Sequence, residues 1–408
     1  MKRWPDTSIF CEPRCQETCK EGQTDRQFKD PGMKNTLALL ILSICLVSPG
    51  CGHSTTALAQ TFDPQTAVSP VAFNTEVVAL KEKYGAKAVI AGVWQGNVEI
   101  SKLALGNSMT DVPATTDMTV RIGGVSQFFL GTLVMRLVEQ GHFSLDDKIS
   151  KWLPDFYQAD DATVGMLIKN LGGYKDYVLE EDFLEDVLAD PFRSFTSEEL
   201  IEYSVRNQEL NFPPGTAQRY SHTEFTILKL VIEAATGQTM AALYQQEFFG
   251  PLGLTRTGYS TNPDLPSPVL HAFGSDRGVY EDITFWNPVW AGESGPLYST
   301  IDDLAKWVPA WGSGQLLTTK SFQELIRKPD VAPPREAYFA SGFVVSGGWY
   351  FQNPNINGFS GMVGYLPSED ITLIVFATQP EVETVVHPAK AIFLDLVDVV
   401  APGNPINF

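Results

Sequence analysis

Apolar positions form short runs or alternate near both ends of the chain and follow helical spacing in between. Residues 88–94 and 98–104 flank Gly96-Asn97, a dipeptide typical of a two-residue β-hairpin turn. Further apolar runs predict strands at 341–345, 349–351, 361–366 and 371–377. Apolar residues every three or four positions predict helices at 75–83, 128–140 and 388–399.

Strands at both ends with helices between them indicate an α+β fold. We expect one antiparallel sheet built from both termini, flanked by helices and carrying a helical insertion subdomain. The domain covers 60–408, with its α/β part at about 70–150 and 290–400 and its helical part at about 151–289.

An apolar run near the N-terminus predicts a secretory signal peptide over residues 33–59. Met33-Lys34 is its basic start, Leu37 to Val47 is an apolar stretch too short to span a bilayer, and cleavage is expected after Ala59. The protein is therefore expected to be exported, periplasmic or extracellular, without a transmembrane span. We interpret residues 1–32 as a mis-annotated N-terminal extension.

All five cysteines lie at or before Cys51, so the exported domain is expected to contain no disulfide. A second interpretation makes the protein a lipoprotein through Cys51, but Ser48-Pro49-Gly50 matches a lipobox poorly. The remaining cysteines and the histidines suit no common metal spacing, so neither a metal nor a cofactor is expected. A net charge of −19 argues against nucleic acid as a partner. No pattern indicates an oligomeric state.

Short motifs occur in a fixed order from about residue 75 to residue 400. They are Arg121-Ile122-Gly123, Leu137–Gly141, Leu145–Asp147, Thr163–Tyr177, Phe212–Gly215, Tyr220-Ser221, Pro251–Leu254, Trp286–Pro288 and Ser299–Leu304. Together they resemble the serine β-lactamase-like or penicillin-binding family, of the class C β-lactamase and D-alanyl-D-alanine carboxypeptidase type. The resemblance implies the β-lactamase/transpeptidase-like fold and a site of the serine hydrolase kind.

The family's first motif, Ser-x-x-Lys, opens a helix and places the lysine amine one turn from the serine hydroxyl whose proton it takes. The matching stretch is Gly124-Val125-Ser126-Gln127, which puts Gly124 at the nucleophile and Gln127 at the lysine. Glycine has no side chain to acylate, and a neutral amide is not a base near pH 7. No lysine in the chain has a serine three residues before it, so the motif is absent rather than shifted.

The other two motifs are also altered. Tyr-x-Asn is half kept as Tyr220-Ser221-His222, so Tyr220 retains the phenol that relays a proton in the family, and His222 offers a general base. At the third motif, His-x-Gly or Lys-x-Gly, Gln352 stands at the histidine and Pro354 at the glycine. Proline cannot donate to a β-ladder, so this edge is expected to lose its substrate-binding role.

These changes favour a catalytically inactive serine hydrolase homologue, a pseudoenzyme that keeps a binding pocket. Its partner is expected to be a peptide, a sugar, another small molecule or a protein. Gln352, Asn353 and Trp349 are the predicted binding residues.

The alternative is an active esterase, carboxypeptidase or β-lactamase with a rearranged catalytic set. Ser126 would be its nucleophile, and Tyr220 or His222 its base. The helical angle argues against Ser126, because a residue two positions later points about 200° away. A third reading, an ordinary family hydrolase with its motifs elsewhere, conflicts with the missing Ser-x-x-Lys.

Overall fold

The computed structural model describes residues 68–381 and 387–407. The predicted signal peptide at 33–59, its cleavage near Ala59, the extension 1–32 and the lipid site at Cys51 all lie outside the described residues. Among the helices that are described, none has the length and apolar character needed to cross a membrane.

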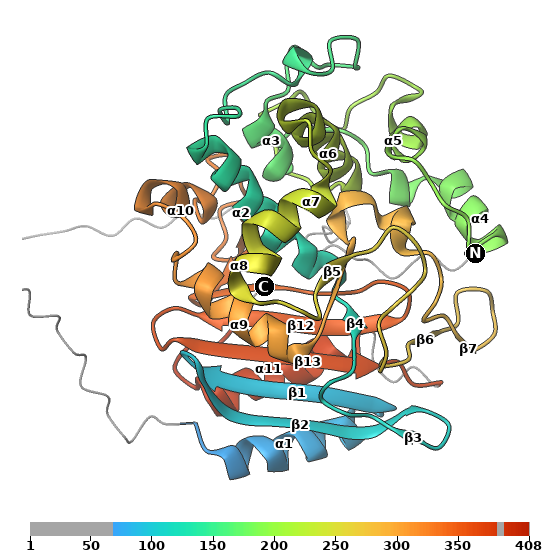
Figure 1. The fold of residues 1–408 in the computed structure, drawn as a ribbon, viewed down its shortest axis with the longest axis vertical. Helices are drawn as coiled ribbons and strands as arrows, with labels where there is room; N and C mark the ends of the chain where they lie inside the picture. Colours follow the sequence, from blue (N-terminus) through green and yellow to red (C-terminus); the bar gives the residue numbers. More distant parts are fainter. Residues whose placement is uncertain (1–67, 382–386, 408) are drawn as a thin grey trace, which may run out of the picture. The chain divides into compact units, whose positions relative to one another are not determined.

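An antiparallel sheet of eight strands organises the described chain, in the order β3-β2-β1-β13-β12-β11-β10-β9 (Figure 1). Strands from the N-terminal side meet strands from the C-terminal side where β1 pairs with β13, with Ile90 opposite Phe376. This confirms the expected α+β sheet built from both ends. The strands are β1 (Ala88–Gln95), β2 (Val98–Met109), β3 (Val112–Pro113), β9 (Tyr338–Phe339), β10 (Val344–Ser346), β11 (Trp349–Gln352), β12 (Phe359–Leu366) and β13 (Ile371–Thr378).

Most predicted elements are present with shifted ends. The strand predicted at 341–345 begins only at Val344, because Gly342 has a φ of +95° that breaks the extended conformation. The helix predicted at 75–83 begins earlier, as α1 (Pro70–Lys83), because the Ser69 side chain caps it by accepting from the Ala72 N–H.

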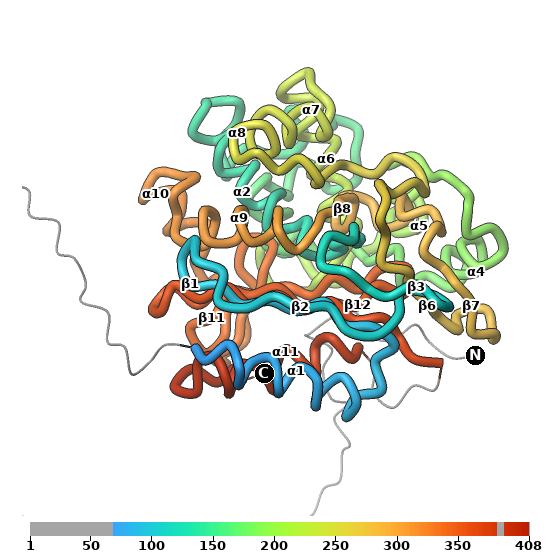
Figure 2. The backbone as a smooth tube through the Cα atoms, turned by 60° about the horizontal axis from the view of Figure 1, so that its bottom comes forward, coloured from blue at the N-terminus to red at the C-terminus, as the bar shows by residue number. Residues whose placement is uncertain are grey.

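Two helices cover the outer face of the sheet. α1 and α11 (Pro388–Val400) pack against each other, and α11 also contacts β12 and β13 (Figure 2). Both helices bury an apolar stripe, Phe73, Val77 and Leu80 in α1 and Ile392, Phe393, Leu396 and Val397 in α11. This spacing is what an amphipathic helix needs to cover a sheet.

On the inner face, α9 (Ile301–Gly312) lies against the sheet and α2 (Ser126–Glu139) packs onto α9. Two stacked aromatic pairs join the helices: Phe128 with Trp311 at 4.2 Å and Phe129 with Trp307 at 3.8 Å between ring centres. α2 is buried along most of its length, so its N-terminal end is fixed beside the sheet.

The expected helical part holds helices up to Leu252 only. These are α3 (Val164–Ile168), α4 (Glu181–Ala189), α5 (Ser197–Val205), α6 (His222–Thr236), α7 (Met240–Tyr244) and α8 (Gly250–Leu252), with short turns η2 (Ile149–Lys151), η3 (Tyr177–Leu179) and η4 (Gln245–Phe249).

Residues 258–282 differ from the expectation of helix, since they form short strands and loops. Pro263, Pro266 and Pro268 remove backbone donors there, which disfavours a continuous helix. The strands are β5 (Gly258–Tyr259) in a small sheet with β4 (Val120–Arg121) and β8 (Leu297–Ser299), and the pair β6 (Phe273–Gly274) and β7 (Glu281–Asp282); η5 (Pro288–Ser294) and α10 (Thr319–Leu325) complete the described elements.

Candidate active site

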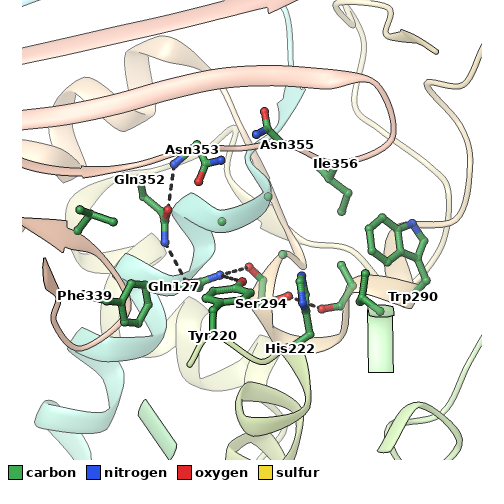
Figure 3. Close-up of a pocket in the computed structure, with 16 residues that line it drawn as sticks. Gln127, Tyr220, His222, Trp290, Ser294, Phe339, Gln352, Asn353, Asn355 and Ile356 are labelled. Atoms are coloured by element: carbon green, nitrogen blue, oxygen red, sulfur yellow. Dashed lines mark hydrogen bonds between the residues drawn. The ribbon is translucent and has the colours of Figure 1, made fainter. Parts of the chain in front are cut away.

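Segments far apart in the sequence meet at one small pocket (Figure 3). They are the turn η1 (Gly123–Val125) before α2, the start of α6, η5, and the loop that follows β11. The cavity measures about 40 Å³, which is room for a few water molecules. Its polar and aromatic lining includes Gln127, Tyr220, His222, Trp290, Ser294, Gln352, Asn353 and Asn355, beside Gly123 and Gly124.

The chain enters α2 through a tight turn, at the position that the sequence resemblance assigns to the nucleophile. Gly123 adopts a φ of +37°, in the region that favours glycine. Ser126, the alternative nucleophile, is fully buried, and its Oγ accepts a hydrogen bond from the Leu297 N–H at 3.1 Å. Ser126 therefore ties α2 to β8 and does not line the pocket.

Gly124 lies directly against the loop after β11. A Cβ atom at position 124 would be 2.7 Å from the Asn353 carbonyl oxygen and 3.4 Å from the Gln352 side chain. Real Cβ atoms essentially never come within 3.0 Å of a heavy atom from a residue that is not a neighbour in the chain. The space from which a serine side chain would project is thus filled by the backbone of residue 353.

Gln127 is committed to hydrogen bonds within the protein. Its Nε2 donates to the Tyr220 hydroxyl at 2.6 Å and to the Ser294 carbonyl at 3.2 Å. Its Oε1 accepts from Gln352 Nε2 at 3.0 Å. Because both sides of this buried amide are engaged, Gln127 is held in one orientation and offers no basic atom.

Gln352 ends β11 and continues the same network. Its Nε2 also donates to the Gly342 carbonyl at 3.2 Å, and its Oε1 accepts from the Asn353 N–H at 3.1 Å. The Asn353 side chain lines the pocket and makes no hydrogen bond to any described residue. β11 stops two residues before Pro354, which has no N–H to extend the ladder.

Tyr220 stands between the amides and the histidine. Burial raises the pKa of its phenol above the ordinary value, and hydrogen bonding with the side chains of Gln127 and Ser294 offsets part of that effect. The phenol is therefore protonated at neutral pH. Because its oxygen accepts from Gln127, its own O–H is the group that can donate, either to the neighbouring Ser294 hydroxyl or to a ligand.

His222 begins α6 and is oriented by a buried carboxylate. Its Nδ1 lies 3.1 and 3.0 Å from the two carboxylate oxygens of Asp176, and its backbone N–H donates to the first of them at 3.2 Å. This arrangement assigns a hydrogen to Nδ1, so that in the neutral imidazole Nε2 is an acceptor. The imidazole packs edge-on against Tyr220, with 5.0 Å between ring centres.

Trp349, one of the three predicted binding residues, lies away from the pocket. It is fully buried, its Nε1 donates to the Asn404 carbonyl at 2.9 Å, and its ring packs against Phe393 of α11. Side chains alternate between the faces of a strand, so Trp349 faces the outer helices while Gln352 faces the pocket. The tryptophan that lines the pocket is Trp290, whose Nε1 donates to Asn357 Oδ1 at 2.8 Å.

Three further residues belong to the site but were not predicted. Asp176 lies within a family-like segment, yet its pairing with His222 depends on the fold. Ser294 belongs to no recognisable motif. Asn355 lines the pocket, and both polar atoms of its side chain are buried without a hydrogen-bond partner among the described residues.

The site has little positive charge and no metal centre within the described chain. Across residues 68–381 and 387–407, no group of three or more His, Cys, Asp or Glu side chains is placed to hold a metal ion. No lysine or arginine is among the described residues that line the pocket. Its polar groups can therefore donate and accept hydrogen bonds and exchange a proton at His222.

Curated relatives resemble parts of this chain. A D-aminopeptidase of Cereibacter sphaeroides is 27% identical over 214 residues, which cover 48% of this chain and 38% of that protein. Penicillin-binding protein 4 of Amycolatopsis lactamdurans is 30% identical over 210 residues, covering 48% of this chain and 52% of the relative. The matched region thus spans about half or less of these proteins.

Solved structures resemble nearly the whole described chain. A D-stereospecific amidohydrolase from Streptomyces sp. superposes with a TM-score of 0.71 at 21% identity, covering 80% of this chain and 99% of that one. The D-amino acid amidase from Ochrobactrum anthropi SV3 complexed with D-phenylalanine gives 0.70 at 22% identity, covering 81% and 98%. These likenesses establish the β-lactamase/transpeptidase-like fold. The sequence profile of the Beta-lactamase family matches residues 73–395, and the chain therefore belongs to that family.

Proposed function

We propose that this serine-hydrolase-like protein binds a small polar ligand in its pocket without forming an acyl-enzyme. An acyl-enzyme needs a side-chain nucleophile beside a proton acceptor. Position 124 carries no side chain, and the Asn353 carbonyl fills the space that one would need. The contact between Gly124 and Asn353 is the observation that carries this proposal.

The amide network supports the same proposal. Gln127, which the sequence resemblance aligns with the family lysine, donates to Tyr220 rather than taking a proton from it. Gln352, which the resemblance aligns with the first residue of the third motif, accepts from the Asn353 N–H and donates to Gln127. A satisfied network of this kind holds its members in place, which suits a rigid binding pocket.

A hydrolase with a rearranged catalytic set is the second candidate, and the names of the relatives favour it, since they are enzymes. Ser294 and His222 line the same pocket, and Asp176 orients the imidazole. In such an enzyme the Ser294 oxygen would attack a carbonyl carbon while its proton passed to His222 Nε2. The Ser294 hydroxyl now donates to the Ala291 carbonyl at 2.5 Å, so it would first have to rotate.

Covalent labelling distinguishes the two candidates. The purified protein is incubated with a fluorescent penicillin and with the p-nitroanilide of D-phenylalanine, and adducts are sought by intact mass alongside release of nitroaniline. We expect neither adduct nor turnover. An adduct mapped to Ser294, lost in Ser294→Ala but kept in Ser126→Ala, would establish the hydrolase instead.

Export remains part of the proposal, supported by the signal-like pattern at 33–59. Expression of the chain from Met33 in a Gram-negative host, followed by N-terminal sequencing of the periplasmic fraction, tests it. We expect the processed protein to begin at Gln60. An unprocessed product that keeps Met33 in the cytoplasmic fraction would contradict export, and lipid-linked Cys51 would support the lipoprotein interpretation.

A further inference from the structure

We infer that the pocket selects neutral ligands that carry an amide and rejects the same molecules when the amide is a free carboxylate. The inference rests on the proposed function and adds the chemical class of the ligand. It follows from the charges around the pocket, from the polar groups still without a partner, and from the size of the cavity.

No cation lines the pocket. The lining contains no lysine or arginine among the described residues. Beside the lining in sequence, Lys175 pairs with Glu209, and the exposed Arg219 donates to the Asn211 side-chain oxygen. Lys169, whose backbone carbonyl is bridged to that of the lining residue Phe339 by the Gln218 side chain, is buried and paired with Glu324. A carboxylate entering the pocket would therefore lose hydration without contacting a cation in the described lining.

His222 does not supply a net positive charge that could pair with a ligand carboxylate. Its Nδ1 faces both oxygens of Asp176, so the two side chains together carry a charge of zero when His222 is protonated and of −1 when it is not. The chain as a whole carries a net charge of −19, which further disfavours anions.

The polar groups of the pocket suit an amide. The Tyr220 O–H can donate to a ligand, and Nε2 of the neutral His222 imidazole can accept, so together they can engage the carbonyl and the N–H of one amide group. The Asn353 side chain has no described hydrogen bond, and both polar atoms of Asn355 are buried without a partner. Buried amide atoms left unpaired are costly, so these residues gain most from a ligand that both donates and accepts.

The cavity limits what can enter. About 40 Å³ admits a head group the size of a few water molecules and not a whole peptide. A terminal amide would therefore enter between Tyr220 and Asn355, and the rest of the ligand would lie outside. A carboxylate has the same size, so charge and not shape is what distinguishes the two.

Matched probes test the inference directly. N-Acetyl-D-alaninamide and N-acetyl-D-alanine are titrated into the protein at neutral pH and followed by ligand-observed NMR. We expect the amide to bind at least roughly ten-fold more tightly than the acid, about 1.4 kcal/mol. Equal or tighter binding of the acid would overturn the inference and leave non-covalent binding intact. Binding of neither probe would overturn it as well, whereas covalent labelling decides the proposed function separately.

An added cation should reverse the preference. In Asn353→Lys an ammonium group enters a lining position whose present side chain makes no described hydrogen bond. We expect this variant to bind the acid roughly ten-fold more tightly than the wild type does. The matched control Asn353→Gln, which keeps the charge, should leave the preference for the amide in place. Unchanged binding of the acid by a folded Asn353→Lys protein would contradict the proposed charge selection.

Discussion

Gln127 joins side chains that would otherwise be unpaired in the interior. It connects Tyr220, the Ser294 carbonyl and Gln352 through hydrogen bonds of 2.6 to 3.2 Å, and it is 1% exposed. In such a network the loss of one member leaves the others desolvated and without partners.

Gln127→Ala is therefore expected to lower the free energy of unfolding by about 1–3 kcal/mol, because it strands buried donors and acceptors. Urea denaturation measures the loss. Asn353→Ala is the control, since that amide lines the same pocket without a described hydrogen bond. Equal stability losses in the two variants would contradict a network centred on Gln127.

Glu293 is a second residue whose surroundings give it unusual properties. This carboxyl group lies in η5 next to Ser294, is fully buried, and accepts from the hydroxyls of Tyr244 at 2.8 Å and Tyr259 at 2.7 Å. Burial raises its pKa from 4.5 to about 7, and hydrogen bonds from the tyrosines and the charge of Lys229 offset part of that effect.

Because the folded protein holds this proton more tightly than the unfolded chain, the proton stabilises the fold fully below about pH 4.5, and that contribution disappears as pH rises through 7. Relative to Glu293→Gln, which cannot ionise, the wild type should lose on the order of 3 kcal/mol across this range. Urea denaturation of both proteins from about pH 5 to about pH 8 measures this difference. If the free energies of unfolding of the two proteins changed in parallel with pH, the raised pKa of Glu293 would be contradicted.

At the scale of elements, the position of α2 depends on close contacts with the residues before β10. A Cβ at Gly131 would lie 2.1 Å from the Ser341 carbonyl oxygen, and one at Gly342 would lie 2.4 Å from the Gln127 carbonyl oxygen. Glycine at both positions lets the helix approach this backbone closely enough for Gln127 and Gln352 to meet.

Gly131→Ala should destabilise the protein by about 1–3 kcal/mol through overpacking. The sign of this stability change is informative, because alanine in place of glycine within a helix ordinarily raises stability by roughly 0.5–1 kcal/mol. Thermal unfolding compares it with Gly403→Ala, where the added Cβ has nothing within 4 Å. A rise in Tm for Gly131→Ala would mean that the helix does not pack as closely as described.

At the scale of the whole molecule, the sheet joins segments from opposite ends of the chain. β1 pairs with β13, and α11 covers the outer face through Phe393, which contacts Trp349. The inner aromatic pairs connect the same sheet, through α9, to α2. These contacts form one continuous hydrophobic core. A substitution that destabilises either face of the sheet should therefore lower the stability of the whole described domain, which should unfold in one cooperative transition.

Phe393→Ala tests this coupling, since it removes a fully buried ring far from the pocket. We expect a loss of about 3–5 kcal/mol and a single transition in which circular dichroism and tryptophan fluorescence change together. Val71→Ala, at a side chain 75% exposed, is the matched control and should change little. Separate transitions for the two signals would contradict one cooperative unit.

The sequence predicted much of this architecture because apolar periodicity is local. It located strands of both termini and the outer helix α11, and it singled out Gly124, Gln127 and Gln352, which line one pocket in the structure. It missed the side on which Trp349 lies, since an aromatic residue suits a ligand site and a core equally well. The contact of Asn353 with Gly124 joins residues over two hundred positions apart, so no local pattern indicates it.

That contact also decides how a serine nucleophile could be engineered into this pocket. A serine introduced at position 124 would place its Cβ against the Asn353 carbonyl oxygen, so this substitution alone should cost stability without giving an acyl-enzyme. The backbone at residue 353 would have to move away before the new hydroxyl had room. Engineering of this site therefore begins at residue 353 and not at residue 124.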